Sequence, residues 1–243
     1  MLTTALAAAA ALIALAFAAS TFERWLVRRR PYDLSWSLSL LMFFVGAAAL
    51  GYGATAGWEG PTFRIFYAFG AIINVPFLAA GQLQLQLRPH RAQAILWTVS
   101  MFSALAVGIV LAAPFTGPVN GSELPRGRDV FPVFPRILAA VGSGVSALIV
   151  FAGTIVGVIG VLRARRSAST GAPPWRRAIG LGCLALGTIT LSASGTLNAR
   201  FGEMRAFSIT LTVGVTILFL GFLLTSVGPR PPAAEQKGSV TPS

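Results

Sequence analysis

The stretch FRIFYAFGAIINVPFLAAGQLQLQL, residues 63–87, decides the fold of this chain. It is long enough to cross a bilayer as a helix, because about 20 consecutive apolar residues are sufficient. At about 100° per residue, Tyr67, Asn74 and the two glycines of the stretch fall on one narrow stripe. Small residues and an amide at mid-membrane depth favour packing against other helices over contact with lipid. The stretch therefore predicts a helix inside a bundle of membrane-spanning helices.

The composition of the whole chain is that of an integral membrane protein. Of its 243 residues, 55% are hydrophobic and 11% are charged, whereas soluble domains carry about 25% charged residues. The formal net charge of +12 could indicate a nucleic-acid partner. However, the basic residues lie in short segments between apolar runs, as membrane topology requires. We therefore predict contact with a lipid bilayer and none with nucleic acid.

The hydropathy pattern predicts an all-α, polytopic membrane protein with seven transmembrane helices. The apolar segments cover about residues 2–22, 34–56, 63–87, 92–113, 137–162, 178–199 and 206–227, so one seven-helix membrane domain occupies residues 1–227. The first segment could instead be a cleaved signal peptide. A signal peptide carries its positive charge before the apolar core, whereas here the arginines follow it, from Arg24 onwards. The order of charges therefore favours an uncleaved helix.

The distribution of basic residues predicts the orientation. With the N-terminus outside, the predicted inner segments hold 13 basic residues and the outer segments hold 6. The inner ones are Arg24, Arg28, Arg29, Arg30, Arg88, Arg91, Arg163, Arg165, Arg166, Arg176, Arg177, Arg230 and Lys237, and the outer ones are Arg64, Arg126, Arg128, Arg136, Arg200 and Arg205. Because cytoplasmic segments are enriched in Lys and Arg, we predict an outside N-terminus and an inside C-terminus. The polar, proline-rich residues 228–243 are predicted to form a disordered cytoplasmic tail.

Asn74 is the strongest candidate for a functional residue, because an amide at mid-membrane must find a hydrogen-bond partner. It could clamp two helices together, or it could contact a ligand in a central cavity together with Tyr67 and Gln82. Pro76 has no N–H to donate to the carbonyl of Ile72, so we expect a helix kink there. Such a kink occurs both as a static bend and as part of a pocket or gate.

A second group of candidate residues lies in the predicted inner loop after the fifth segment. Basic residues close to an anionic membrane surface contribute about 1 kcal/mol each. We therefore expect contact with anionic lipid headgroups from Arg163, Arg165, Arg166, Arg176 and Arg177.

The residues that catalysis or ion coupling needs are missing from the predicted spans. No Asp, Glu, Lys or Arg lies deep in a span, although such groups usually carry proton relays and ion coupling. His90, the only histidine, lies in a short inner turn, and Cys183 is the only cysteine. This excludes an internal disulfide, a cysteine-rich metal site and a pair of haem-binding histidines. We therefore predict no catalytic residue, no cofactor and no metal site, and we expect that the chain is not an enzyme.

Two stretches carry a resemblance to known proteins. ERWLVRRRPYDLSW, residues 23–36, and FRIFYAFGAIINVPFLAAGQLQL, residues 63–85, resemble uncharacterised seven-helix integral membrane proteins of actinobacteria. That resemblance implies a membrane location and no particular activity. The topology alone is similar to that of the SWEET sugar transporters, which have a 3+1+3 helix layout.

An internal repeat of three helices would give this chain the same 3+1+3 layout. An offset of 141 residues places Gly46 on Gly187 and Arg64 on Arg205. The SWEET transporters carry hinge prolines in several repeat helices, whereas this offset puts Ile217 opposite Pro76.

Two functions follow from these patterns. The first is a non-enzymatic structural or accessory component of the bacterial inner membrane. The alternative is a facilitative transporter of an uncharged or amphipathic small molecule, with Asn74, Tyr67 and Gln82 facing its path. They differ in whether a water-accessible cavity reaches Asn74.

Overall fold

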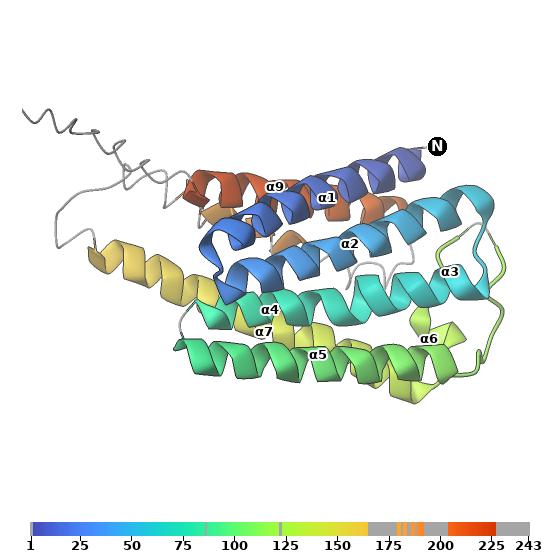
Figure 1. Ribbon diagram of the computed structural model, residues 1–243. Helices are drawn as coiled ribbons and strands as arrows, with labels where there is room; N and C mark the ends of the chain where they lie inside the picture. The colour runs from blue at the N-terminus through green and yellow to red at the C-terminus, as the bar shows by residue number, and fades with distance from the viewer. Residues whose placement is uncertain are drawn as a thin grey trace, which may run out of the picture.

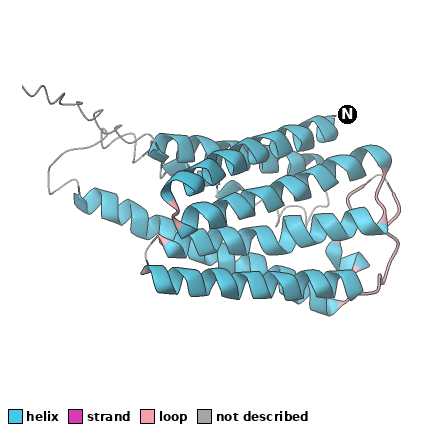
Figure 2. Ribbon diagram, viewed as in Figure 1, coloured by secondary structure: helices cyan, strands magenta, loops and turns pink. Residues whose placement is uncertain are grey.

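The computed structural model describes residues 2–85, 87–121, 123–164, 179–180, 182–183, 186–187, 189–191 and 204–226. Within these residues the chain consists of helices joined by loops, without a β-strand (Figure 2). Five of the described helices are long and apolar enough to cross a membrane: Thr3–Arg28, Pro31–Ala56, Gly60–Gln84, His90–Ala112 and Val133–Gly157. A shorter apolar helix covers Ser208–Leu224. The structure thus confirms an all-helical chain with several candidate membrane spans. The predicted segment 178–199 lies largely, and the tail 228–243 wholly, outside the described residues.

Helices α1 (Leu2–Arg28) and α2 (Pro31–Ala56) form an antiparallel pair that runs the length of the bundle (Figure 1). Their shared surface is rich in alanine, a small residue that lets two helices approach closely. Pro31 occupies the first turn of α2, where its missing N–H removes no helical hydrogen bond. Arg29 connects the two helices in a left-handed conformation, with a φ of 51°.

The third crossing is a continuous helix with an irregular middle. It consists of α3 (Gly60–Ile65), a π-helical segment η1 (Phe66–Ile73) and α4 (Asn74–Gln84). α2 lies directly against η1, because a Cβ added to Gly46 would be 2.8 Å from the Cα of Gly70. The predicted kink near Pro76 thus corresponds, in the structure, to a change of helix type just before the proline.

The remaining helices surround this crossing. α5 (Pro89–Ala112) packs against α4, α7 (Val133–Ala164) packs against α4 and η1, and α9 (Met204–Ser226) packs against α1. In Figure 1, α9 and α1 lie on one side of the bundle and α5 on the other. Large apolar side chains of α5 and α7, such as Trp97, Met101 and Leu148, are exposed on the outside of the bundle. They form the surface that lipid covers in a membrane-spanning helix.

One end of the bundle, which we call the Trp58 end, is closed by the connection between α5 and α7. This connection contains α6 (Gly127–Val130) and is joined to the α2–α3 turn by a hydrogen bond from the Trp58 N–H to the Gly121 carbonyl, at 2.8 Å. Trp58, Phe63 and Phe131 are at most 2% exposed. Their rings form an aromatic cluster that fills this end of the bundle.

Arg64, in α3, links the Trp58 end to the C-terminus of α5. Its guanidinium lies 4.1 Å from the ring centroid of Phe115 and donates to the carbonyls of Val110 and Ala113. These carbonyls belong to the last turn and the C-terminal cap of α5. A positive charge at a helix C-terminus stabilises both the unpaired carbonyls and the helix dipole.

Candidate functional site

The irregular middle of the third crossing is held by α7. Pro76 has no N–H, so it cannot donate to the carbonyl of Ile72, four residues earlier, or to that of Ala71, five residues earlier. The Ser143 hydroxyl of α7 donates to the Ala71 carbonyl. Gly142, the residue before Ser143, lies close to Ile72: a Cβ added to Gly142 would be 3.1 Å from the Ile72 carbonyl oxygen. A side chain of another helix thus supplies a donor that Pro76 lacks.

Asn74 lies at the junction of η1 and α4 and is 6% exposed. Its Oδ1 accepts a hydrogen bond from the N–H of Val75 at 2.8 Å. Its backbone carbonyl accepts one from the hydroxyl of Ser39, on α2, at 2.7 Å. The hydrogen bond between helices at this level therefore uses the backbone of Asn74, while the amide oxygen bonds within its own helix.

Tyr67 and Gln82, which the sequence groups with Asn74, face different neighbours. Tyr67 belongs to the aromatic cluster at the Trp58 end. Gln82 lies against α7, where Gly153 leaves room for its side chain. A cavity of about 20 Å³ lies between α2, η1 and α9, which is room for a single water molecule. Within the described residues, the three predicted residues thus lie in three separate packing sites.

At the opposite end, which we call the Asp33 end, Gln84 joins three helices. Its Oε1 accepts from the hydroxyl of Ser35, on α2, at 2.8 Å, and its Nε2 donates to the carbonyl of Ala92, on α5, at 3.0 Å. Gln84 is 5% exposed. The sequence shows three glutamines at alternate positions, and no signal in it distinguishes Gln84 from the other two.

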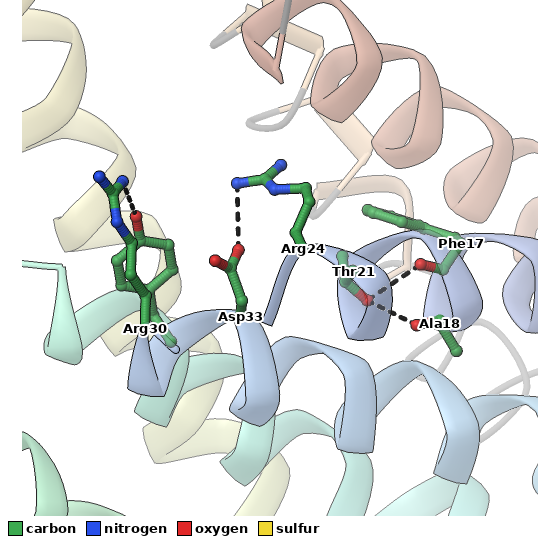
Figure 3. A network of polar contacts seen from close by, with 7 residues as sticks. Phe17, Ala18, Thr21, Arg24, Arg30 and Asp33 are labelled. Atoms are coloured by element: carbon green, nitrogen blue, oxygen red, sulfur yellow. Dashed lines mark hydrogen bonds and ion pairs between the residues drawn. The ribbon is translucent and has the colours of Figure 1, made fainter. Parts of the chain in front are cut away.

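A partly buried arginine and a fully buried aspartate form an ion pair at the Asp33 end (Figure 3). Asp33, in the first turn of α2, is 0% exposed, and its Oδ1 lies 3.0 Å from Nη2 of Arg24. The Arg24 guanidinium also lies 4.6 Å from the ring centroid of Phe222, on α9. Sequence reasoning placed Arg24 in an inner loop and ended the first helix at residue 22. In the structure, Arg24 lies inside α1 and connects it to two other helices.

Three arginines form the turn beside this pair. Arg28, Arg29 and Arg30 are all exposed. Nη1 of Arg30 donates to the hydroxyl of Tyr32 at 2.7 Å (Figure 3). This hydrogen bond raises the pKa of Arg30 above its ordinary value. The Arg29 guanidinium lies 4.8 Å from the ring centroid of Trp25.

The other predicted basic residues lie near or beyond the described part of the chain. Arg163 is in the last turn of α7. Arg165, Arg166, Arg176 and Arg177 lie outside the described residues. Among the residues that the structure describes, no group of three or more His, Cys, Asp or Glu side chains could hold a metal ion.

Five of the described helices have the length and hydropathy to cross a membrane, and small-residue contacts and buried polar side chains lie between the helices, as is typical of α-helical integral membrane proteins. Comparison of the chain with protein-family models, curated proteins and solved structures finds no match.

Proposed function

We propose that this chain is a non-enzymatic structural or accessory protein of the bacterial inner membrane, with its N-terminus outside and its C-terminus inside. One observation carries the proposal: several polar side chains inside the bundle form hydrogen bonds to neighbouring helices. Ser39 and Ser143 donate to backbone carbonyls of neighbouring helices, and Gln84 joins three helices. Polar groups used in this way stabilise one packing arrangement. We also propose that the arginines from Arg163 to Arg177 contact anionic lipid headgroups, as their positions in the sequence favour.

The orientation can be tested by cysteine labelling in intact cells. In a Cys183→Ser background, Glu59→Cys is expected to react with a membrane-impermeant thiol reagent, because residue 59 is exposed at the Trp58 end. Ser239→Cys, in the predicted inner tail, is expected to react only after the cells are permeabilised. The opposite pattern would reverse the proposed topology.

A facilitative carrier is the second candidate, and the π-helical segment favours it. π-helical turns inside α-helices occur frequently at functional sites, and η1 ends three residues before Pro76. A segment of this kind can change its helical register, and with it the orientation of α3 relative to α4. In such a carrier, Asn74 would become accessible to water in another conformation.

Substitutions at Asn74 distinguish the two candidates. For a structural role, Asn74→Leu is expected to lower thermal stability in detergent by about 1 kcal/mol, because it removes the acceptor of the Val75 N–H. Asn74→Cys is expected to be as unreactive toward a small water-soluble thiol reagent as Ile72→Cys, whose position is 0% exposed. A stable leucine variant together with a reactive cysteine at position 74 would favour the carrier instead.

A further inference from the structure

Three positive charges face outward from the turn between α1 and α2. The described residues contain two ion pairs, Arg24–Asp33 and Arg128–Asp129, and neither includes an arginine of this turn. The carboxylate of Asp33 is turned inward to Arg24 (Figure 3). Glu23 precedes the turn on α1, but five helical residues place it about 140° around the helix from Arg28. The charges of Arg28, Arg29 and Arg30 are therefore presented to the surroundings of the bundle.

The neighbours of the turn place it at the surface of the membrane. Val27, immediately before it, is an apolar residue that is 79% exposed, as expected of a side chain that lipid covers. The rings of Trp25 and Tyr32 contact two of the arginines, and Trp and Tyr concentrate at the level of the lipid headgroups. An exposed apolar residue, two aromatic rings and three arginines together are typical of the membrane–water interface, where the lipid phosphates lie.

The conformation of Arg29 indicates that its side chain has a function beyond forming the turn. Arg29 has a φ of 51°, and its N–H donates to the carbonyl of Trp25 at 2.7 Å, which ends α1. Glycine adopts this left-handed conformation without steric cost and is the usual residue at such a helix end. An arginine is sterically less favourable there, so a role for its charge accounts for its presence better than the geometry of the turn does.

We propose that the turn of Arg28, Arg29 and Arg30 binds the phosphate of an anionic phospholipid headgroup. Guanidinium groups offer several N–H donors in a plane and match the oxygens of a phosphate. Arg29 is held by its contact with the Trp25 ring and Arg30 by its hydrogen bond to Tyr32, so two of these groups are fixed against interfacial aromatic residues. A zwitterionic phosphatidylcholine headgroup adds its own positive charge and binds more weakly. This site is independent of whether the chain is an accessory protein or a carrier.

The test measures binding of fluorescent phosphatidylglycerol to the purified full-length protein in nonionic detergent. Arg29→Gly is expected to weaken binding about five-fold, the equivalent of about 1 kcal/mol for one basic residue. Its thermal stability without phosphatidylglycerol should be equal or higher, because glycine relieves the left-handed strain. Arg29→Lys keeps the charge and should keep most of the affinity. Neutralising Arg28, Arg29 and Arg30 together to glutamine should weaken binding about a hundred-fold.

A matched control removes three arginines from the other end of the bundle. Changing Arg126, Arg128 and Arg136 to glutamine should leave the affinity for phosphatidylglycerol unchanged. An equal loss in both triple variants would mean that only the total charge matters and would overturn the proposal. The same holds if Arg29→Gly binds like the unchanged protein, or if inorganic phosphate at matched ionic strength displaces the labelled lipid as well as unlabelled phosphatidylglycerol does. Should the triple variant at the turn fail to fold, Arg29→Gly and Arg29→Lys decide the question by themselves.

Discussion

Replacing Arg24 with leucine is expected to destabilise the protein by about 3 to 5 kcal/mol, because the change leaves a buried carboxylate without its partner. Asp33 is 0% exposed, and Arg24 lies 3.0 Å from it. The substitution also removes the guanidinium from the ring of Phe222, which contributes to the contact between α1 and α9. Thermal unfolding in detergent at neutral pH would measure the loss.

The double variant Arg24→Leu/Asp33→Leu separates the charge from the packing. Replacing both members of a buried ion pair by apolar residues is often neutral or stabilising, so most of the lost stability should return. Arg28→Leu, one turn later and exposed, serves as the control and should change stability by less than about 0.5 kcal/mol. Similar small effects of Arg24→Leu and Arg28→Leu would show that the ion pair contributes little.

The helices themselves could be predicted from the sequence because bilayer thickness requires long apolar runs. Five of the described helices satisfy that requirement. Their ends were harder to predict, because a charged residue usually marks the end of a span. Arg24 and Asp33 form an ion pair across the α1–α2 turn, and both helices continue past the apolar residues. That pairing depends on how two helices face each other, which the apolar pattern does not encode.

At the candidate site, too, the sequence indicates the residue that needs a hydrogen-bond partner and not the residues on other helices that form the bonds. The amide of Asn74 was expected to need a hydrogen-bond partner; Asn74 is 6% exposed, and its Oδ1 accepts from the N–H of Val75 in its own helix. The hydroxyl groups that bond the backbone of this crossing come from Ser39 and Ser143, which lie 35 and 72 residues away from their acceptors. Serines are common in membrane helices and usually bond their own helix. Nothing in the sequence therefore marks these two as links between helices.

The Trp58 end depends on contacts of the same long range. Residues 114–136 connect the fourth and fifth predicted spans on the predicted outer side and contain five prolines. In the structure, part of this segment folds onto the α2–α3 turn, because Trp58 and Phe63 provide an apolar surface for Phe131. Aromatic residues in a loop thus indicate that the loop can pack onto the end of a bundle. Which ring they contact becomes known only from the fold.

The hydrogen bonds from α2 to the third crossing require one relative position of the two helices. That position depends on two glycines. A Cβ added to Gly46 would lie 2.8 Å from the Cα and 3.0 Å from the N of Gly70. Both atoms belong to backbone, which cannot turn aside as a flexible side chain can. The same contact sets the register in which Ser39 reaches the carbonyl of Asn74 and Ser35 reaches Gln84.

Gly46→Ala is accordingly expected to destabilise the protein by about 1 to 3 kcal/mol, as overpacking of a close helix contact does. In an ordinary helix position the same substitution stabilises by up to about 1 kcal/mol, so the sign of the effect is the test. Gly108→Ala provides the control, because an added Cβ at Gly108 meets no atom within 4 Å. Thermal unfolding in detergent should show opposite shifts for the two variants, and Gly46→Leu should lose more stability than Gly46→Ala. Equal stabilisation by alanine at both glycines would mean that α2 and η1 are not in backbone contact. In that case the hydrogen bonds from Ser39 and Ser35 would have to hold these helices in register without it.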